Sequence, residues 1–320
     1  MANLKEVRTR IESVNSTKQI TSAMKMVAAS KLRKAQNSIM ALRPYADKFS
    51  EILERIMSSC QQPKAKSQKP MANTQQPTPN SQQPTANSLL IIPLSSNKGL
   101  CGTFNANVIR ETMNLIKDEY QDLFDKGKID ILCVGSKVEE ALRFKKYPVV
   151  GNENILLDDI TYDNAAAFAE RLMKDFDDKK YDKIVFVYNQ FKNAATQVLV
   201  TEQFLPIISQ QPTANGQQPT ANGQEPAANS QEPTDYIFMP NKEDIFKEML
   251  PKSLKLQVYK ILLDSYASEQ GARMISMTQA TDNATELLKE LNISYNKARQ
   301  SAITNELVEI ISGANALNNS

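Results

Sequence analysis

The two ends of the chain repeat apolar or small residues at spacings of three and four, with almost no helix breaker. The first such stretch covers residues 1–57 and the second covers 240–317. This spacing places one such side chain per turn on a helix face that a partner helix must cover. At about 1.5 Å per residue, the first helix would be roughly 80 Å long, more than a compact enzyme core requires. The pattern therefore predicts an antiparallel rod in which the two ends of the chain meet.

The first stripe consists of Leu4, Val7, Ile11, Val14, Ala28, Leu32, Ala35, Ile39, Leu42, Ala46, Phe49, Leu53 and Ile56. The second consists of Met277, Ala280, Ala284, Leu287, Leu291, Ile303, Leu307, Ile310, Ala314 and Leu317.

Residues 18–27 interrupt the first stripe. The seam positions there hold Lys18, Thr21 and Lys25, and the apolar side chains Ile20, Met24 and Val27 fall on a neighbouring face. One interpretation is a local irregularity. The other is an apolar face turned outward, toward a partner that is not the C-terminal helix.

Two further residues interrupt the terminal helices. Pro44 falls away from the seam and predicts a kink or a break between two stacked helices. Gly271, inside the C-terminal helix, predicts a close approach of another helix.

Residues 89–208 alternate strand and helix patterns. Alternation of this kind predicts a small three-layer, Rossmann-like α/β domain with a mostly parallel sheet. The predicted strands are 89–94, 129–134, 183–188 and 195–202, and the predicted helices are 107–126 (ended by Gly127), 138–144 and 163–176.

Two tracts of tandem heptads separate this domain from the helices. Their units resemble QQPTANS, with a proline in every unit and no apolar seam, so neither a helix nor a packed core is expected. The resulting domain prediction is an N-terminal helix 1–60, a disordered tract 61–88, an α/β domain 89–208, a second disordered tract 209–234, and a foot segment with the C-terminal helix 235–320.

Composition excludes several functional classes. The chain contains no histidine, which removes histidine-based nucleophilic catalysis and histidine metal ligands. Its three cysteines have no CxxC spacing and are expected to be free thiols in a reducing compartment. Neither a membrane span nor a signal peptide is evident, so we expect a protein that stays inside the cell.

Charge is unevenly distributed along the chain. Residues 1–43 hold nine Lys or Arg against two acids, and residues 235–320 hold nine basic against eleven acidic residues. Pairing between the two helices and simple solvation both explain this distribution. Nucleic acid is not an expected partner, because the basic residues have no interleaved aromatics and no known motif.

The loop at residues 95–105 is the segment that most resembles a ligand-binding site. Gly99 and Gly102 follow a strand and precede a helix, as they do in phosphate-binding loops. The GxGxxG pattern is incomplete, however, and the chain has no GxxxxGK[ST] motif. Residues 135–137 offer a weaker copy of the same arrangement.

Four segments resemble one family closely. They are TKQITSAMKMVAASKLRKAQ (17–36), NKGLCGTFNAN (97–107), ASEQGARMISMTQATDNA (267–284) and YNKARQSAITNELVEIISGANAL (295–317). In this order they resemble the gamma subunit of the F-type rotary ATP synthase. The match covers both ends and, more loosely, the middle, and it excludes only the heptad tracts.

The resemblance implies a non-catalytic central rotor shaft for ATP synthesis coupled to proton transport. Its partners would be the alpha and beta subunits of the catalytic ring, the epsilon subunit and the ring of c subunits. Nucleotide chemistry would belong to beta, so no catalytic residue, cofactor or metal is expected on this chain. It would lie peripherally on the cytoplasmic face of the bacterial inner membrane, held there by the complex.

The resemblance also implies contact residues. Met24 and Lys25 are similar to the family's contacts with the lower loops of beta, and Arg299, Gln300 and Thr304 to its contacts with a catch loop of beta. Tyr236 and Phe238 are similar to the foot that meets the c-ring.

Two departures from the family pattern stand out. The loop has Lys98 where the family usually has arginine, which puts the usual pairing in doubt, and Met239 replaces a common acidic residue. The alternative function is a nucleotide-binding α/β enzyme with helical arms. A coiled-coil scaffold unrelated to ATP synthesis is a third, and it would need neither the polar break at 18–25 nor the ARQ…T cluster.

Overall fold

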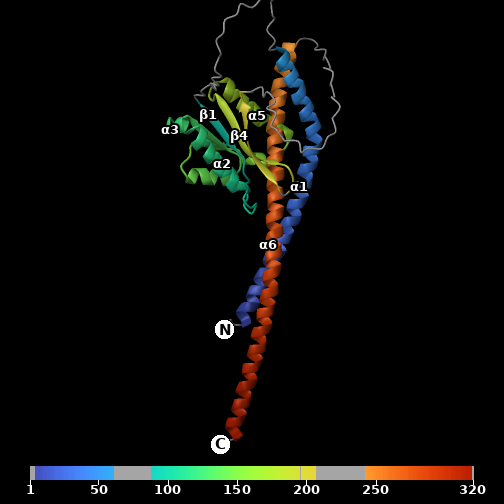
Figure 1. Ribbon diagram of the computed structural model, residues 1–320, viewed down its shortest axis with the longest axis vertical. Helices are drawn as coiled ribbons and strands as arrows, with labels where there is room; N and C mark the ends of the chain where they lie inside the picture. The colour runs from blue at the N-terminus through green and yellow to red at the C-terminus, as the bar shows by residue number, and fades with distance from the viewer. Residues whose placement is uncertain (1–3, 61–87, 195, 207–241, 319–320) are drawn as a thin grey trace, which may run out of the picture.

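The computed structural model describes residues 4–60, 88–194, 196–206 and 242–318 (Figure 1). Two long helices dominate it: α1 (Leu4–Cys60) and α6 (Lys242–Asn318), 57 and 77 residues long. They lie side by side in antiparallel directions and form a shaft, with an α/β domain against its upper half. Apart from Ser88, the tracts predicted at 61–88 and 209–234 lie outside the described residues.

The predicted seam between the two helices is confirmed over most of its length. On α1 the buried stripe residues include Ala28, Leu32 and Ile39, each at most 6% exposed. On α6 Met277 and Ala284 are buried in the same way. Apolar spacing at three and four is a local signal, and a partner helix covers it as expected.

The predicted break at Pro44 is wrong. α1 continues as one helix through this residue, whose side chain is exposed. Ala46 is buried and Leu42 packs against the cluster shared with α6, so tertiary contacts on both sides hold the helix across the missing N–H.

The last part of the predicted seam is also wrong. Thr21 lies opposite Thr281, which places residue 4 opposite about residue 298. The remaining twenty or so residues of α6 therefore extend about 30 Å beyond α1. In Figure 1 the C-terminus lies well below the N-terminus, so the two ends do not meet. Three stripe residues in this tail, Ile303, Leu307 and Ile310, are 49–68% exposed.

The α/β domain contains one five-stranded sheet in the order β3-β2-β1-β4-β5. Four strands are parallel, and β5 pairs antiparallel with β4. The strands are β1 (Leu89–Pro93), β2 (Ile129–Cys133), β3 (Val149–Asn152), β4 (Lys183–Phe191) and β5 (Gln197–Leu205).

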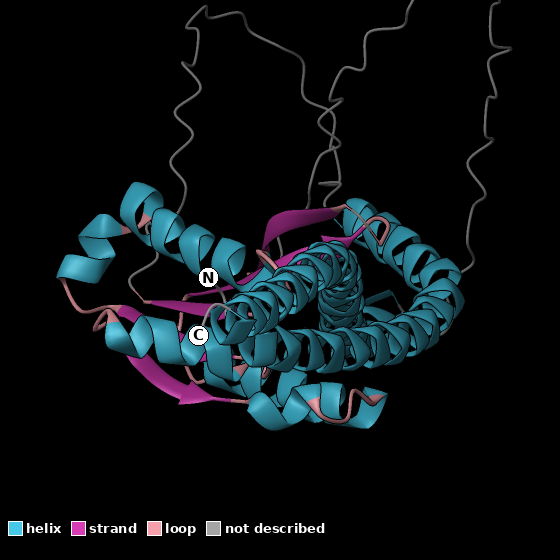
Figure 2. Cartoon of the chain, turned by 90° about the horizontal axis from the view of Figure 1, so that it is seen from below, coloured by secondary structure: helices cyan, strands magenta, loops and turns pink. Residues whose placement is uncertain are grey.

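Helices cover both faces of the sheet, as Figure 2 shows from below, so the predicted three layers are confirmed. One face packs against α2 and α4, and the other against α5 and α6. The helices of the domain are α2 (Phe104–Glu119), α3 (Gln121–Asp125), α4 (Ser136–Phe144), the 3-10 turn η1 (Asn154–Leu157) and α5 (Tyr162–Asp177).

Two details of the domain differ from prediction. β3 was not predicted, because an edge strand of four residues containing glycine and asparagine has almost no apolar pattern. The helix expected at 107–126 begins three residues earlier and is divided at Tyr120 into α2 and α3. Gly127 does follow the helical segment, with a left-handed φ of +65°.

The shaft and the domain share one core. Leu254, Val258, Ile261 and Leu262 of α6 belong to the same buried cluster as the strands and α5. Farther along α6, Leu263 and Ala267 pack against Leu32 and Ile39 of α1. Residues 261–265 and 267–272 of α6 are all buried, because α1 covers one side and the sheet covers the other.

Candidate functional site: contact surfaces of the shaft

The interruption in the α1 stripe is an outward-facing apolar patch. Thr21 is buried, and its hydroxyl oxygen lies 2.9 Å from that of Thr281 on α6. A polar pair thus replaces an apolar contact at the seam. Ile20, Met24 and Val27 face away from it and are 56%, 39% and 56% exposed. The apolar face formed by Ile20, Met24 and Val27, here called the α1 patch, therefore turns outward, and Lys25 lies half-buried beside it.

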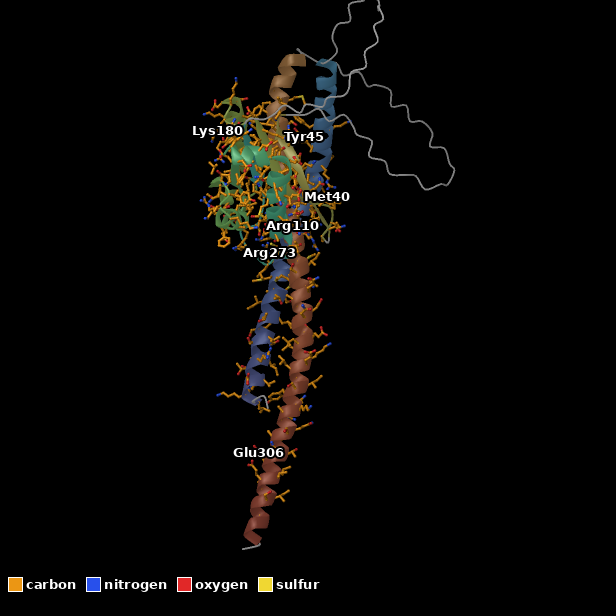
Figure 3. The ribbon with its side chains drawn as sticks, turned by 60° about the vertical axis from the view of Figure 1, so that its left-hand side comes forward. Met40, Tyr45, Arg110, Lys180, Arg273 and Glu306 are labelled. Carbon is orange, nitrogen blue, oxygen red and sulfur yellow. The ribbon has the colours of Figure 1, made fainter. Side chains whose placement is uncertain are left out.

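The second surface is the tail of α6 beyond the end of α1, marked by Glu306 in Figure 3. Arg299, Gln300 and Thr304 are all exposed on this tail, and the Thr304 hydroxyl donates to the Gln300 carbonyl oxygen at 2.9 Å. The apolar residues exposed among them are Ile303, Leu307, Val308, Ile310 and Ile311. Exposed apolar residues at this density indicate a surface that a partner covers.

The structure places these two surfaces at different levels of the shaft. Met24 lies opposite about residue 278 of α6, so Arg299 is some twenty residues farther down, or roughly 30 Å. No single partner loop would reach both surfaces. The predicted foot residues, Tyr236 and Phe238, lie outside the described residues.

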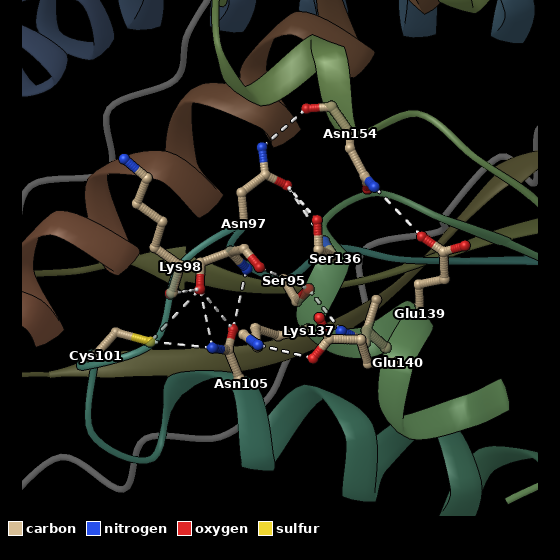
Figure 4. A network of polar contacts seen from close by, with 12 residues as sticks. Ser95, Asn97, Lys98, Cys101, Asn105, Ser136, Lys137, Glu139, Glu140 and Asn154 are labelled. Atoms are coloured by element: carbon tan, nitrogen blue, oxygen red, sulfur yellow. Dashed lines mark hydrogen bonds and ion pairs between the residues drawn. The ribbon is translucent and has the colours of Figure 1, made fainter. Parts of the chain in front are cut away.

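The weaker of the two phosphate-loop candidates, residues 135–137, is filled by side chains from elsewhere in the domain (Figure 4). Asn97 Oδ1 accepts from the Ser136 N–H at 3.2 Å, and Asn154 Oδ1 accepts from the Gly135 N–H at 2.9 Å. Ser95 Oγ accepts from the Val138 N–H at 3.0 Å. Backbone N–H groups at the start of α4, which a bound phosphate would need, are therefore already satisfied.

Neighbouring groups hold this network in place. Asn152 and Asn154 donate to the Glu139 carboxylate, and Asn97 donates to the Asn154 carbonyl oxygen. The bonds from Asn152, then from Asn154 and Arg143, lower the pKa of Glu139. A Cβ on Gly135 would lie 2.4 Å from the Ser95 carbonyl oxygen, so this glycine permits close packing of the backbone.

The loop after β1 meets helix α6 directly. Cys101 and Phe104 form a buried cluster with Ala272, and a Cβ on Gly102 would lie 2.8 Å from Ser276 Oγ. In open α/β sheets ligands bind beyond the carboxyl ends of the strands, at the point where strand order reverses. Here that point lies between β1 and β4, and the shaft helix lies against the loop that follows β1.

The interpretation of Gly271 needs correction. Its close neighbour is the carbonyl oxygen of Ala194 in the turn between β4 and β5, 3.1 Å from where a Cβ would stand. The residue allows close approach of the domain's hairpin, whereas a helix was expected.

Sequence reasoning missed the polar residues at the shaft–domain interface. Asp264 and Glu269 of α6 are 3% and 7% exposed. Burial raises the pKa of Asp264 to about 6 and also raises the pKa of Glu269. Acidic residues within an otherwise apolar helical run could have drawn attention to them. Their neighbours on other elements were not visible in the sequence.

These features define a class: a shaft protein that acts through partner contacts along a two-helix rod, with an attached α/β domain whose loop after β1 packs against the shaft. A family model described as ATP synthase matches residues 3–317. The chain is 46% identical over 318 residues to an ATP synthase gamma chain from Christiangramia forsetii, covering 99% of this chain and 100% of that one. It is also 45% identical to an ATP synthase gamma chain from Flavobacterium johnsoniae, covering 99% of this chain and 100% of that one. The chain belongs to the ATP synthase gamma chain family.

Solved structures share this fold. A chain from the Euglena gracilis mitochondrial ATP synthase, from the assembly of OSCP, F1 and c-ring, matches with a TM-score of 0.62 at 20% identity, covering 98% of this chain and 94% of that one. A chain from the central stalk and c-ring of the Tetrahymena thermophila mitochondrial ATP synthase matches with a TM-score of 0.53 at 23% identity. The match covers 82% of this chain and 99% of that one. Among the described residues of the present chain, no helix has the length and apolar character needed to cross a bilayer.

Proposed function

We propose that this chain is the central rotor shaft of a proton-translocating F-type ATP synthase, coupling rotation of a c-ring to conformational cycling of the beta catalytic sites. The observation that carries the proposal is the tail of α6. It extends as a single helix with exposed apolar residues from a body in which shaft and domain share one core. Such a tail is suited to the centre of a ring of partner subunits.

The physical requirement for a rotor is asymmetry. Identical catalytic sites around a ring adopt different states only if the shaft contacts them differently. The α1 patch faces one side only, and the α/β domain lies against one side of the shaft. Rotation of such an object would present each beta subunit with a different surface in turn.

The residue roles follow this arrangement. We assign Met24 and Lys25 to contact with the lower loops of beta, and Arg299, Gln300 and Thr304 to its catch loop. Their exposure, or half-exposure for Lys25, leaves them available. Tyr236 and Phe238 are assigned to the foot that meets epsilon and the c-ring. The chain is non-catalytic itself, and its position is peripheral on the cytoplasmic face of the bacterial inner membrane.

The heptad tracts are proposed to lie outside the catalytic ring, because a loop of some 26 residues within it would obstruct rotation. Among the described residues, α1 ends and α6 begins at the upper end of the structure. Deleting both tracts should leave assembly and coupling intact if they are passive, and a complex that cannot assemble would contradict this.

The enzyme alternative is weakened because the N–H groups at 135–138 are already satisfied and the loop after β1 packs against α6. Its test is the same experiment that tests the rotor: purification of the tagged chain from its own cells, with ATPase assay. Recovery with alpha, beta and epsilon subunits supports the rotor. Recovery alone, with intrinsic nucleotide turnover, would support the enzyme.

The contact assignment is tested by Arg299→Ala combined with Gln300→Ala. We expect ATPase activity of the purified complex to fall at least about tenfold, equivalent to roughly 1.4 kcal/mol of lost stabilisation. The matched control is Arg110→Ala with Asn107→Ala, another arginine–amide pair, whose side chains bond to each other on α2 and to Thr103 at its N-cap. Equal activity in the two variants would contradict the assigned role.

A further inference from the structure

The contact between α6 and the loop at residues 97–102 includes an arginine that binds the loop through its backbone. Arg273 Nη2 donates to the carbonyl oxygens of Lys98 at 3.1 Å and Gly99 at 3.3 Å. Its Nη1 pairs with Glu269 Oε1 at 2.5 Å, one helical turn away. In Figure 3 Arg273 lies at the lower end of the α/β domain, where the loop approaches the shaft.

The pair is largely shielded from water. The side chains of Arg273 and Glu269 are 15% and 10% exposed. Ion pairs on the surface contribute little, but a buried carboxylate whose cation is removed is costly. Arg273 therefore neutralises Glu269 and is held by it in one orientation, with the second branch of its guanidinium directed at the loop.

The backbone of the 97–102 loop is fixed by its own conformation and hydrogen bonds. Leu100 and Gly102 have left-handed φ values of +64° and +60°. The Lys98 carbonyl oxygen accepts from Ser96 Oγ at 2.6 Å as well as from Arg273, so both of its lone pairs are used. The tip at Lys98, Gly99 and Leu100 is nevertheless exposed, with Leu100 at 62%.

The level of this contact along the shaft matters. Thr21 lies opposite Thr281, so Arg273 is at about the level of Ala29, five residues along α1 from Met24. The loop tip and the α1 patch therefore lie at one height on different elements. Their angular relation is constant only if the loop turns with α6.

We propose that Arg273, held by Glu269, is a positioning residue that fixes the 97–102 loop to the shaft, so that the loop tip keeps a constant rotational angle relative to the α1 patch. Arg273 hydrogen-bonds only to backbone carbonyl oxygens of the loop, so the contact does not depend on the side chain at position 98. The lysine at this position thus leaves the contact intact. The proposal rests on the rotor function for its consequence, but the attachment itself does not depend on it.

The attachment is tested by amide hydrogen exchange on the tagged chain, recovered from its own cells with whatever subunits accompany it. We expect Arg273→Ala to speed exchange in a peptide covering 97–103 about tenfold, while a peptide from β4 is unchanged. Arg273→Lys, which keeps the charge beside Glu269 but lacks the fork, should give an intermediate rate. Arg110→Ala and Lys98→Ala are the controls and should match the unaltered chain.

Because Arg273→Ala leaves Glu269 uncompensated, a second variant combines it with Glu269→Gln. Loop exchange should stay fast in this variant although the buried charge is gone. Unchanged loop exchange in both would overturn the attachment. If the β4 peptide exchanges faster too in both, the residue stabilises the whole fold and the positioning role is refuted.

The consequence for coupling is measured in vesicles, as protons pumped per ATP hydrolysed. With Arg273→Ala we expect hydrolysis to persist and the pumping ratio to fall at least about twofold, with partial rescue by Arg273→Lys. A loosened loop with an unchanged ratio would refute the positional role. Recovery of the chain without ATPase subunits would instead refute the rotor function, and the exchange data would still decide the attachment.

Discussion

Single residues at the interface between shaft and domain make stability depend on pH. Asp264 is the clearest case: it is 3% exposed, and its Oδ1 has no hydrogen-bond partner among the described residues. The charged groups around it are Lys260 on its own helix, Arg43 on α1 and Glu202 on β5, with the Tyr188 hydroxyl on β4. The two cations do not offset the cost of burial, so the pKa of Asp264 is raised to about 6.

The sign of the effect follows from this shift. Folding raises the pKa of Asp264 from 3.8 to about 6, so the folded chain binds the proton more tightly than the unfolded chain. The free-energy cost of burying the ionised Asp264 carboxylate is absent below pH 4, grows between pH 4 and 6, and is fully present above pH 6. Asp264→Asn should therefore raise the free energy of unfolding by up to about 3 kcal/mol at pH 8 and hardly at pH 4. Urea unfolding at both pH values measures it.

The matched control is Asp282→Asn, an exposed aspartate on the same helix. It should change unfolding at neither pH. A gain for Asp264→Asn of equal size at pH 4 and pH 8 would mean that packing, and not ionisation, accounts for the effect.

At the scale of elements, the loop after β1 packs so closely on helix α6 that one loop position favours glycine. Gly102 has φ +60° and no room for a Cβ beside Ser276, whereas Gly99 in the same loop has open space. We expect Gly102→Ala to lower the free energy of unfolding by about 1–2 kcal/mol, from strain and displacement of Ser276. Gly99→Ala should be close to neutral. Equal effects of the two substitutions, measured by urea unfolding, would contradict the proposed fit.

Elements also show what the sequence could and could not predict. The seam and the first strands were predictable, because apolar spacing of helices and buried strands is local. The edge strand β3 has too little pattern to detect. The contacts of Arg273 and Gly271 join residues more than seventy positions apart, and no local rule indicates which loop approaches a helix. Gly271, and the pair Glu269 and Arg273 four apart on one helix, were visible signs of that interface without showing what lies against it.

At the scale of the whole molecule, the body and the tail of α6 have different roles. The body contains the shared core, and the tail beyond about residue 298 consists of exposed side chains through residue 314, apart from half-buried Ser301. A chain that ends at residue 298 should therefore stay folded, with an unfolding midpoint in urea close to that of the full chain. It should also associate less, because it lacks the exposed apolar residues Ile303, Leu307, Val308, Ile310 and Ile311.

Sedimentation of the two purified chains at the same concentration measures the difference. We expect larger species for the full chain and a monomer for the shortened one. A full-length variant with Leu307→Gln and Ile310→Gln is the control for length, and it should behave like the shortened chain if apolar exposure is the cause. If the shortened chain instead lost its cooperative unfolding, the tail would belong to the folded core. A tail held only by partner subunits is what a shaft turning inside a ring requires.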